Sequence, residues 1–237
     1  GVCFDKIYNQ AAKFKYMFGG KAETPVVIRT MVGAGINAAA QHSQMLTAIF
    51  THIPGLKVVC PSNPYDAKGL LIQSIRDNDP VIFCEHKSLY GVEGEVSEES
   101  YVIPFAEANV MRDGGDVTIV AYGMMVGKAM DAAETLAKEG VECDVIDLRT
   151  LSPIDMETVL ESVENTGRLV VVDEANPRCS IATDVSAQVA QQAFKSLKAQ
   201  IEMVTAPHTP VPFATTLENL YIPSPEQIVV AVRKTLN

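Results

Sequence analysis

The sequence predicts an α/β protein with mostly parallel sheets, on the strength of two observations. Short apolar runs typical of buried strands alternate with helical segments along almost the whole chain. A strand–helix–strand unit implies parallel pairing, because the chain must cross over before the next strand can run in the same direction. We therefore expect a three-layer arrangement in both halves of the chain.

The first half contains one such unit. Apolar runs predict strands at residues 26–30, 57–60 and 81–85. Apolar residues at three- and four-residue spacing over 45–53 predict a helix whose first turn contains His42. A second helix is expected over 65–76.

The second half repeats the alternation after residues 87–116, which are rich in glycine and glutamate and indicate a crossover between domains. Strands are expected at 117–121, 141–148, 169–172 and 201–205. Helices are expected at 124–138, 183–197, from Ser152-Pro153 to about 165, and from Ser224 onward, the last with a capping-box pattern. Residues 207–225 are proline-rich and are expected to be irregular.

Composition excludes several classes of protein. The 237 residues carry a formal net charge of −10, which disfavours a nucleic acid or an anionic membrane as partner. No apolar run is long enough to span a bilayer. The five cysteines are odd in number and show no CxxC spacing, so neither a zinc site nor a thioredoxin-type site is indicated. Reduced cysteines within apolar runs point to the cytoplasm.

Familiar catalytic motifs are absent. Gly33-Ala34-Gly35 supplies only part of a dinucleotide fingerprint, because Ala38 stands where the third glycine is required. A doubly wound domain that binds a nucleotide would also need a glycine motif for the diphosphate, and the sequence has none. A Rossmann oxidoreductase is therefore not indicated.

The segment Gln41-His42-Ser43-Gln44 is the strongest candidate for chemistry. A histidine that faces a cleft at the start of a helix can exchange a proton near neutral pH. A structural role, in which the imidazole bonds a backbone carbonyl at the edge of the core, remains open from spacing alone.

Other candidates are weaker. His86 lies just past a strand end, where ligands bind in parallel sheets. His52 suits a helix C-terminus and His208 a surface loop. The acidic turn Asp77-Asn78-Asp79 requires a nearby positive charge, which a bound cation could supply, or it is a solvated turn.

Six stretches together resemble one family, the β subunits of the thiamine-diphosphate-dependent first components of 2-oxo acid and acetoin dehydrogenase complexes. The matching stretches are 4–13, 41–44, 52–59, 64–71, 75–81 and 147–153. Residues 30–35, 38–46 and 170–180 are most similar to the acetoin type, so acetoin is the expected substrate. Pyruvate or a branched-chain 2-oxo acid is the alternative.

The resemblance implies a transketolase-like fold and a shared site. Residues 1–100 would form an incomplete pyrimidine-binding domain, 101–116 a linker, and 117–237 a domain of the transketolase C-terminal type. His42 matches the family's active-site histidine. A potassium site would map onto Val26, Ser74, Ile75, Asp77 and Asp79.

The implied activity needs partners. Acetoin would be cleaved with thiamine diphosphate and Mg²⁺, and the two-carbon unit passed to a lipoyl group. An α subunit in an α2β2 assembly would hold the diphosphate, and an acyltransferase core would receive the product. The family's pyrimidine-activating glutamate precedes the region that matches residue 1, so we expect a truncated chain that is inactive alone. The alternative is an inactive fragment that serves as a docking module for the core.

Overall fold

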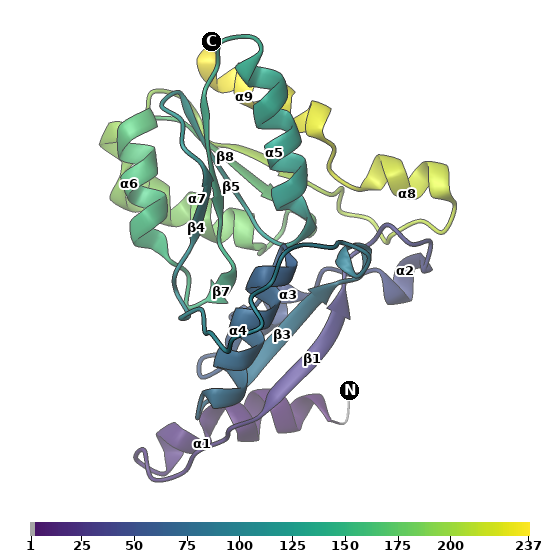
Figure 1. Cartoon of the computed structure of the whole chain (residues 1–237), viewed down its shortest axis with the longest axis vertical. Helices are drawn as coiled ribbons and strands as arrows, with labels where there is room; N and C mark the ends of the chain where they lie inside the picture. The colour runs from purple at the N-terminus through teal and green to yellow at the C-terminus, as the bar shows by residue number, and fades with distance from the viewer. Residues whose placement is uncertain (1–2) are drawn as a thin grey trace.

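The computed structural model describes residues 3–237 and contains two sheets, one in each half of the molecule (Figure 1). The first sheet has four strands in the order β1-β3-β2-β7. Their bounds are β1 (Val27–Val32), β3 (Val81–His86), β2 (Lys57–Val59) and β7 (Thr150–Ser152). The first three are parallel, and β7 pairs with β2 in the opposite direction. A strand from the second half of the sequence therefore completes the first sheet.

The second sheet has five strands in the order β4-β6-β5-β8-β9. Their bounds are β4 (Asn109–Arg112), β6 (Cys143–Asp147), β5 (Val117–Ala121), β8 (Leu169–Asp173) and β9 (Glu202–Thr205). All neighbours are parallel except β4, which runs antiparallel to β6. The prediction of an α/β fold with mostly parallel sheets is confirmed. The predicted linker, residues 101–116, contains β4, and the proposed domain limits stay a prediction.

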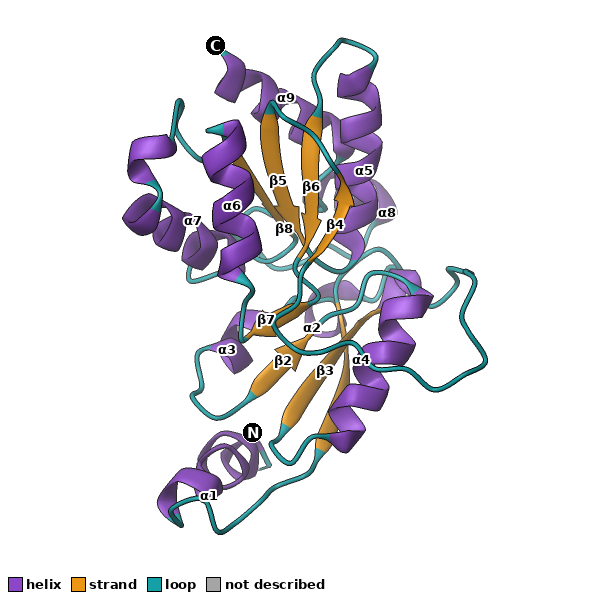
Figure 2. Ribbon diagram, turned by 60° about the vertical axis from the view of Figure 1, so that its left-hand side comes forward, coloured by secondary structure: helices purple, strands orange, loops and turns teal. Residues whose placement is uncertain are grey.

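Helices cover both sheets (Figure 2). Those of the first half are η1 (Lys6–Ala11), α1 (Ala12–Met17), α2 (Ala39–His42), α3 (Thr47–Thr51), α4 (Pro64–Arg76) and η2 (Lys87–Leu89). Those of the second half are α5 (Met124–Ala137), α6 (Met156–Thr166), α7 (Ile181–Gln192), η3 (Phe194–Ser196), α8 (Thr215–Tyr221) and α9 (Pro225–Leu236).

Local signals explain several helix ends. The Asn63 side chain caps α4 by accepting from the Asp66 N–H, and Pro64 follows at the first helical position. Ser224 and Gln227 form the predicted capping box of α9. The prediction that Ser152 caps the next helix is wrong: Ser152 ends β7, and Asp155 caps α6 by accepting from the Thr158 N–H. The short helix α8 was also missed, because it lies in the proline-rich stretch.

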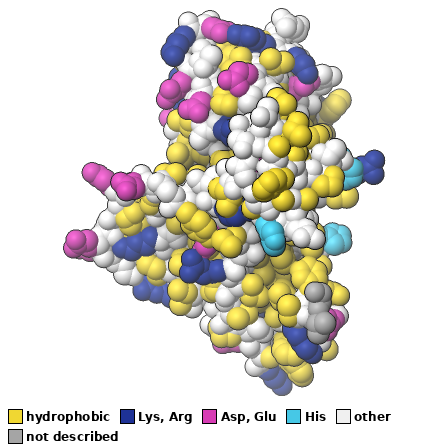
Figure 3. Space-filling view, turned by 90° about the vertical axis from the view of Figure 1, so that its right-hand side faces the viewer, with side chains coloured by type: hydrophobic (Ala, Val, Ile, Leu, Met, Phe, Trp, Pro, Cys, Tyr) yellow, Lys and Arg dark blue, Asp and Glu magenta, His cyan; other side chains and the backbone are white. Residues whose placement is uncertain are grey.

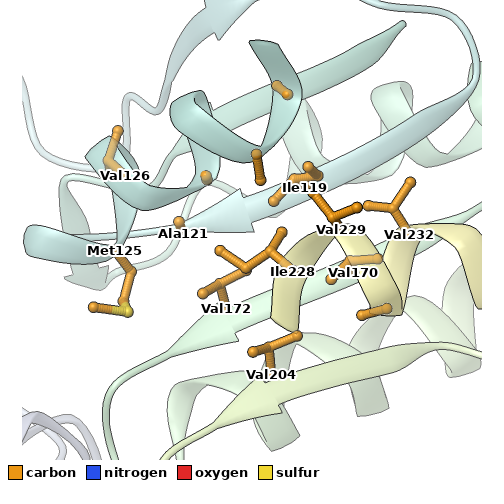
Figure 4. Packing of buried hydrophobic residues seen from close by; sticks show 14 of the residues in the cluster. Ile119, Ala121, Met125, Val126, Val170, Val172, Val204, Ile228, Val229 and Val232 are labelled. Atoms are coloured by element: carbon orange, nitrogen blue, oxygen red, sulfur yellow. The ribbon is translucent and has the colours of Figure 1, made fainter. Parts of the chain in front are cut away.

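The core of the second half is continuous on both faces of its sheet. Every residue of β5 and β8 is buried. One face packs against α5 and α9, through residues such as Ile119, Val170 and Ile228 (Figure 4). The other face packs against α6 and α7, and this cluster extends into the first sheet through Val58 and Ile82. One hydrophobic cluster therefore spans both sheets.

Two further expectations concern location. Among residues 3–237, no helix has both the length and the apolar character that a membrane span requires. Cys60, Cys84 and Cys143 are buried and unpaired, and Cys3 and Cys179 are exposed and unpaired. Burial raises the pKa of the Cys84 and Cys143 thiols to about 12, so these cysteines act as small apolar side chains.

Candidate active site

His42 lies at the end of the short helix α2 and is exposed. The prediction of one helix over 45–53 that begins near His42 is wrong, because α2 and α3 are separate and residues 43–46 between them are not helical. The Gln44 carbonyl accepts from the Gly33 N–H at the end of β1 instead of continuing a helical ladder (3.2 Å). His42 therefore does not lean toward the core, and it belongs to a loop-like stretch, residues 34–47, which we call the His42 segment.

Two hollows flank the His42 segment. One has a volume of about 460 Å³ and is lined by His42 together with Met31, Ile36, Leu46 and Tyr90. The other, of about 440 Å³, lies between the segment and the proline-rich loop that carries His208. An exposed imidazole beside a largely apolar hollow can exchange a proton with a ligand that is partly shielded from water.

Lys87 fixes the backbone at His42. Its side chain is buried, and its ammonium group donates to the His42 carbonyl. Burial lowers the pKa of Lys87, although the nearby carboxylates of Glu218 and Glu174 act in the opposite direction. Lys87 thus brings a positive charge to the last carbonyl of α2, where cations are favoured.

His86, the weaker candidate, has no free nitrogen. Its Nδ1 accepts from the Ser88 N–H (3.3 Å), which assigns the proton to Nε2. Nε2 then donates to Glu174 Oε2 at 2.7 Å, and both side chains are buried. His86 is part of the structure beneath the site, not a group that faces a ligand.

Gly33-Ala34-Gly35 has a packing role. Gly33 adopts a φ of +87°, and a Cβ atom there would lie 1.9 Å from His86 Nε2. Gly35 has a φ of +105°, and its Cβ would lie 2.5 Å from the Ser88 hydroxyl. The glycines are required because the chain turns sharply against His86 and Ser88.

Three carboxylates that the sequence did not mark as site residues reach the His42 segment from the second half of the chain. Glu174 Oε1 accepts from the Ala34 N–H at 2.6 Å. Glu218 accepts from the N–H groups of Gly35 and Asn37, both at 2.9 Å. Asp173 connects to Thr47 through the Tyr122 hydroxyl. No sequence signal linked Glu218, in the proline-rich stretch, to residues 35–37.

The acidic turn of the expected potassium site has positive charges of its own. The Lys57 ammonium bonds both oxygens of Asp77 at 2.7 Å and lies 3.1 Å from Asp79, which also pairs with Lys15 at 2.7 Å. Burial alone would raise the pKa of Asp79, but the two lysines outweigh it and hold that pKa below its usual value. The turn therefore does not need a bound cation for charge balance.

The remaining ligands of that expected site differ in exposure. Ser74 is buried, while Val26 and Ile75 are exposed. The Val26 carbonyl already accepts from the Val81 N–H (3.0 Å), and the Ser74 carbonyl lies 3.4 Å from the Asp77 nitrogen. Within residues 3–237, no group of three or more His, Cys, Asp or Glu side chains could hold a metal ion. Potassium at this turn remains a prediction.

The other two histidines are placed as expected. His52 is the exposed residue after the last turn of α3, and His208 is exposed in the proline-rich loop. Neither contacts the side chain of His42 through a hydrogen bond. The structure thus leaves His42 as the histidine that faces the 460 Å³ hollow.

Comparisons with known proteins agree with this architecture. Residues 2–93 match the transketolase pyrimidine binding domain, and residues 106–228 match the transketolase C-terminal domain. Among solved structures, the chain is similar to a split-gene transketolase described as an inactive β4 tetramer. The TM-score is 0.80 at 25% sequence identity, and the match covers 100% of this chain and 72% of that one.

Sequence relatives are closer still. The chain is 78% identical to the β subunit of acetoin:2,6-dichlorophenolindophenol oxidoreductase from Cupriavidus necator, over 100% of this chain and 70% of that subunit. The corresponding Bacillus subtilis subunit is 56% identical, with 97% and 67% covered. The pyruvate dehydrogenase E1 β subunit of Rickettsia felis is 46% identical, with 98% and 71% covered. The chain therefore belongs to the transketolase-like family of thiamine-diphosphate-dependent dehydrogenase β subunits, which includes the acetoin and pyruvate enzymes.

Proposed function

We propose that the chain acts as the β subunit of an enzyme that cleaves acetoin with thiamine diphosphate and passes the two-carbon unit to a lipoyl group. One observation carries the substrate choice. Identity to an acetoin-oxidising β subunit is 78% over the whole chain, whereas the pyruvate dehydrogenase β subunit of Rickettsia felis reaches 46%. Pyruvate or a branched-chain 2-oxo acid is the alternative substrate.

The residues of this chain fit part of a cofactor site. The hollow beside His42 offers Met31, Ile36, Leu46 and Tyr90, which can pack against an aromatic ring system. Thiamine diphosphate, when bound, supplies the electron sink that breaking a carbon–carbon bond requires. Because residues 3–237 hold no carboxylate cluster suited to a divalent cation, we assign Mg²⁺ and the diphosphate to the α subunit.

His42 would act as a proton donor and acceptor for the substrate. Its imidazole is exposed to the hollow, while Lys87 holds its backbone carbonyl. Once the α subunit covers this face, the apolar wall would exclude water and strengthen hydrogen bonds between the imidazole and a substrate oxygen. Proton transfer by a positioned side chain contributes roughly 10²–10⁴-fold to a rate.

An α subunit in an α2β2 assembly is the proposed partner at this face. Met31 is 64% exposed, Ile36 52% and Tyr90 58%, all beside the hollow. Figure 3 shows apolar side chains gathered over the half of the molecule that carries the first sheet, with histidine among them. A cluster of exposed apolar side chains of this kind is typical of an interaction site. We also propose that the assembled enzyme docks to an acyltransferase core. We further propose that the protein works in the reducing cytoplasm, because all five cysteines are unpaired.

The test is turnover by the chain assembled with its α subunit. We expect acetoin-dependent reduction of 2,6-dichlorophenolindophenol that requires thiamine diphosphate and Mg²⁺, with pyruvate a much poorer substrate. Faster turnover of pyruvate would keep the enzyme class and overturn the substrate. Binding to the acyltransferase core without any turnover would favour the docking-module alternative.

We propose potassium at the acidic turn as a secondary feature. The support is the match of Val26, Ser74, Ile75 and Asp77 to the family pattern, from which Asp79 departs. The opposing fact is the pairing of the turn with Lys57 and Lys15. Replacing NaCl by KCl at equal ionic strength should raise the melting temperature of wild type by a few degrees at millimolar potassium. An Asp77→Asn variant should lose the difference. Equal melting temperatures for wild type in both salts would refute the site.

A further inference from the structure

We propose that Asp173, Glu174 and Glu218 are positioning residues that hold the His42 segment and thereby set the place of His42. The catalytic part of this inference rests on the proposed function. The three carboxylates belong to the second half of the chain, and each reaches a different point of the segment. Together they fix both ends of residues 34–47 while the His42 side chain between them stays exposed.

Glu174 holds the start of the segment. It is 1% exposed and accepts from two donors, the Ala34 N–H at 2.6 Å and His86 Nε2 at 2.7 Å. Because both partners donate, only a carboxylate serves both, and a glutamine would turn an N–H toward one of them. Breaking such a buried, charge-assisted bond is costly.

Glu218 holds the next turn. Its two oxygens accept from the N–H groups of Gly35 and Asn37, and the side chain is 1% exposed. Asn37 has a φ of 56°, a conformation that needs support in a residue other than glycine. The Asn37 side chain adds bonds to the Phe213 carbonyl (3.2 Å) and the Thr215 hydroxyl (3.0 Å) at the start of α8.

Asp173 holds the far end through Tyr122. The Tyr122 hydroxyl donates to Asp173 Oδ1 at 2.6 Å and lies 3.1 Å from the Thr47 hydroxyl, and all three side chains are buried. Asp173 also accepts from the N–H groups of Ala175 and Ala182, so its own position is fixed. Asp173 and Glu174 are consecutive, and the end of β8 therefore holds both ends of the His42 segment.

Lys87 completes the arrangement. Its ammonium donates to the His42 carbonyl. Burial lowers the pKa of Lys87, and the Glu218 and Glu174 carboxylates oppose part of that change. One buried cation thus offsets part of the negative charge of Glu174 and Glu218, and it also holds the middle of the segment in place. Apolar packing alone would let the segment slide. Hydrogen bonds at residues 34, 35, 37, 42 and 47 have fixed directions and therefore restrict this movement.

The test uses the α–β assembly with Glu174→Gln, Glu218→Gln and, as a milder change, Thr47→Val. The matched control is Asp66→Asn, because Asp66 is also buried and also joins the two halves, through Arg149 Nε at 3.1 Å, but touches no residue of the segment. Two quantities are measured: hydrogen exchange of residues 35–46, and kcat and KM for acetoin in wild-type and His42→Ala backgrounds.

We expect faster exchange in residues 35–46 for the glutamine variants, and not for Asp66→Asn. The glutamine variants should lose roughly 10–100-fold in kcat, because a shift of about 1 Å at a reacting group can cost that much. In the His42→Ala background the further loss should shrink to about twofold, because the carboxylates act through His42. Thr47→Val should follow in the same direction with a smaller effect.

Two results would overturn the inference. Exchange of residues 35–46 that is unchanged in both glutamine variants would show that the carboxylates do not hold the segment, whatever the enzyme's substrate. The glutamine variants could lose as much kcat in the His42→Ala background as in wild type, or Asp66→Asn could lose as much kcat as they do. Either result would show that the three carboxylates only stabilise the contact between the halves and do not position His42. If acetoin is not turned over at all, the proposed function fails, while the exchange experiment still decides the positioning.

Discussion

The two sheets differ in how completely they are covered. In the second sheet every residue of β5 and β8 is buried, and helices close both faces. In the first sheet β1 is an edge strand, with Arg29 and Met31 exposed, and the core on the α4 face holds only five buried residues. The second half, whose sheet is enclosed by helices, is suited to hold side chains in fixed positions. The first half, whose sheet is more open, is suited to present side chains to a ligand or a partner. The His42 segment belongs to the open half but is held by side chains from the enclosed half.

Replacing His42 should give the largest effect and tests whether the open half carries the chemistry. We expect His42→Ala to lower kcat with acetoin roughly 10²–10⁴-fold, the range for loss of a proton-transferring side chain. His52→Ala is the control, because His52 is also exposed on the first half but lies at the end of α3. Activity of His42→Ala equal to that of the control would remove His42 from the site.

A core substitution in each sheet tests the difference in coverage. Ile119→Ala in β5 should destabilise the protein by about 2–5 kcal/mol, because a fully buried side chain leaves a cavity. Met31→Ala in β1 should change stability by about 0.5 kcal/mol or less, because Met31 is 64% exposed. Urea unfolding of the chain measures both. Equal losses would mean that β1 is covered in solution, and the comparison between the sheets would have to be revised.

A glycine substitution tests the sharp turn that begins the His42 segment. Gly33→Ala combines a left-handed backbone with a Cβ placed 1.9 Å from His86 Nε2, so we expect a loss of about 2–4 kcal/mol. Gly91→Ala is the matched control, since nothing lies within 4 Å of its Cβ and its backbone is not left-handed. If both variants melt like wild type, the turn is looser than described.

The pH dependence of stability tests the junction between the halves, where Asp147 accepts a hydrogen bond from the Ser62 hydroxyl. Burial raises the pKa of Asp147 to about 7, although hydrogen bonds from the Ser62 hydroxyl and the Arg149 N–H lower it in part. The unfolded pKa is about 3.9, so the folded state binds the proton more tightly. The stability from this group is fully present below the unfolded pKa and is lost as pH rises toward 7.

Asp147→Asn should remove that dependence. At about 1.4 kcal/mol for each unit of pKa difference, the unfolding free energy of wild type relative to the variant should fall by a few kcal/mol between pH 4 and pH 7. Above pH 8 the difference should be constant. Parallel stability curves for the two proteins across this range would show that Asp147 titrates normally.

Much of the fold could be predicted because its strands are buried on both faces. Such strands are continuous apolar runs, and the prediction of a strand over 117–121 matches β5 residue for residue. The helix expected over 45–53 failed because the Gln44 carbonyl bonds Gly33, a contact between distant residues that periodicity does not encode. The start of α6 failed because β7 uses Ser152 to pair with β2, so tertiary pairing outweighed a local capping signal.

The candidate site was predicted only in part. His42 was identified from its resemblance to family members, and the structure places it beside a hollow. Glu174 and Glu218 could not be assigned from the sequence, because their partners in the His42 segment are backbone N–H groups more than a hundred residues away. Every residue except proline has a backbone N–H, so the residue type does not show which N–H a carboxylate will bind. Gly33 and Gly35 pack against His86 and Ser88. The sequence shows these glycines only as part of an incomplete dinucleotide-binding motif, which does not reveal their packing role.

The most direct test of the account is a crystal structure of the α–β assembly with thiamine diphosphate bound. We predict that the cofactor lies against the hollow formed by Met31, Ile36, Leu46 and Tyr90. The His42 imidazole should come within about 3 Å, or one water molecule, of the reacting groups, with the Glu174 and Glu218 bonds to residues 34–37 intact. A cofactor bound elsewhere, with His42 still facing solvent, would contradict the account.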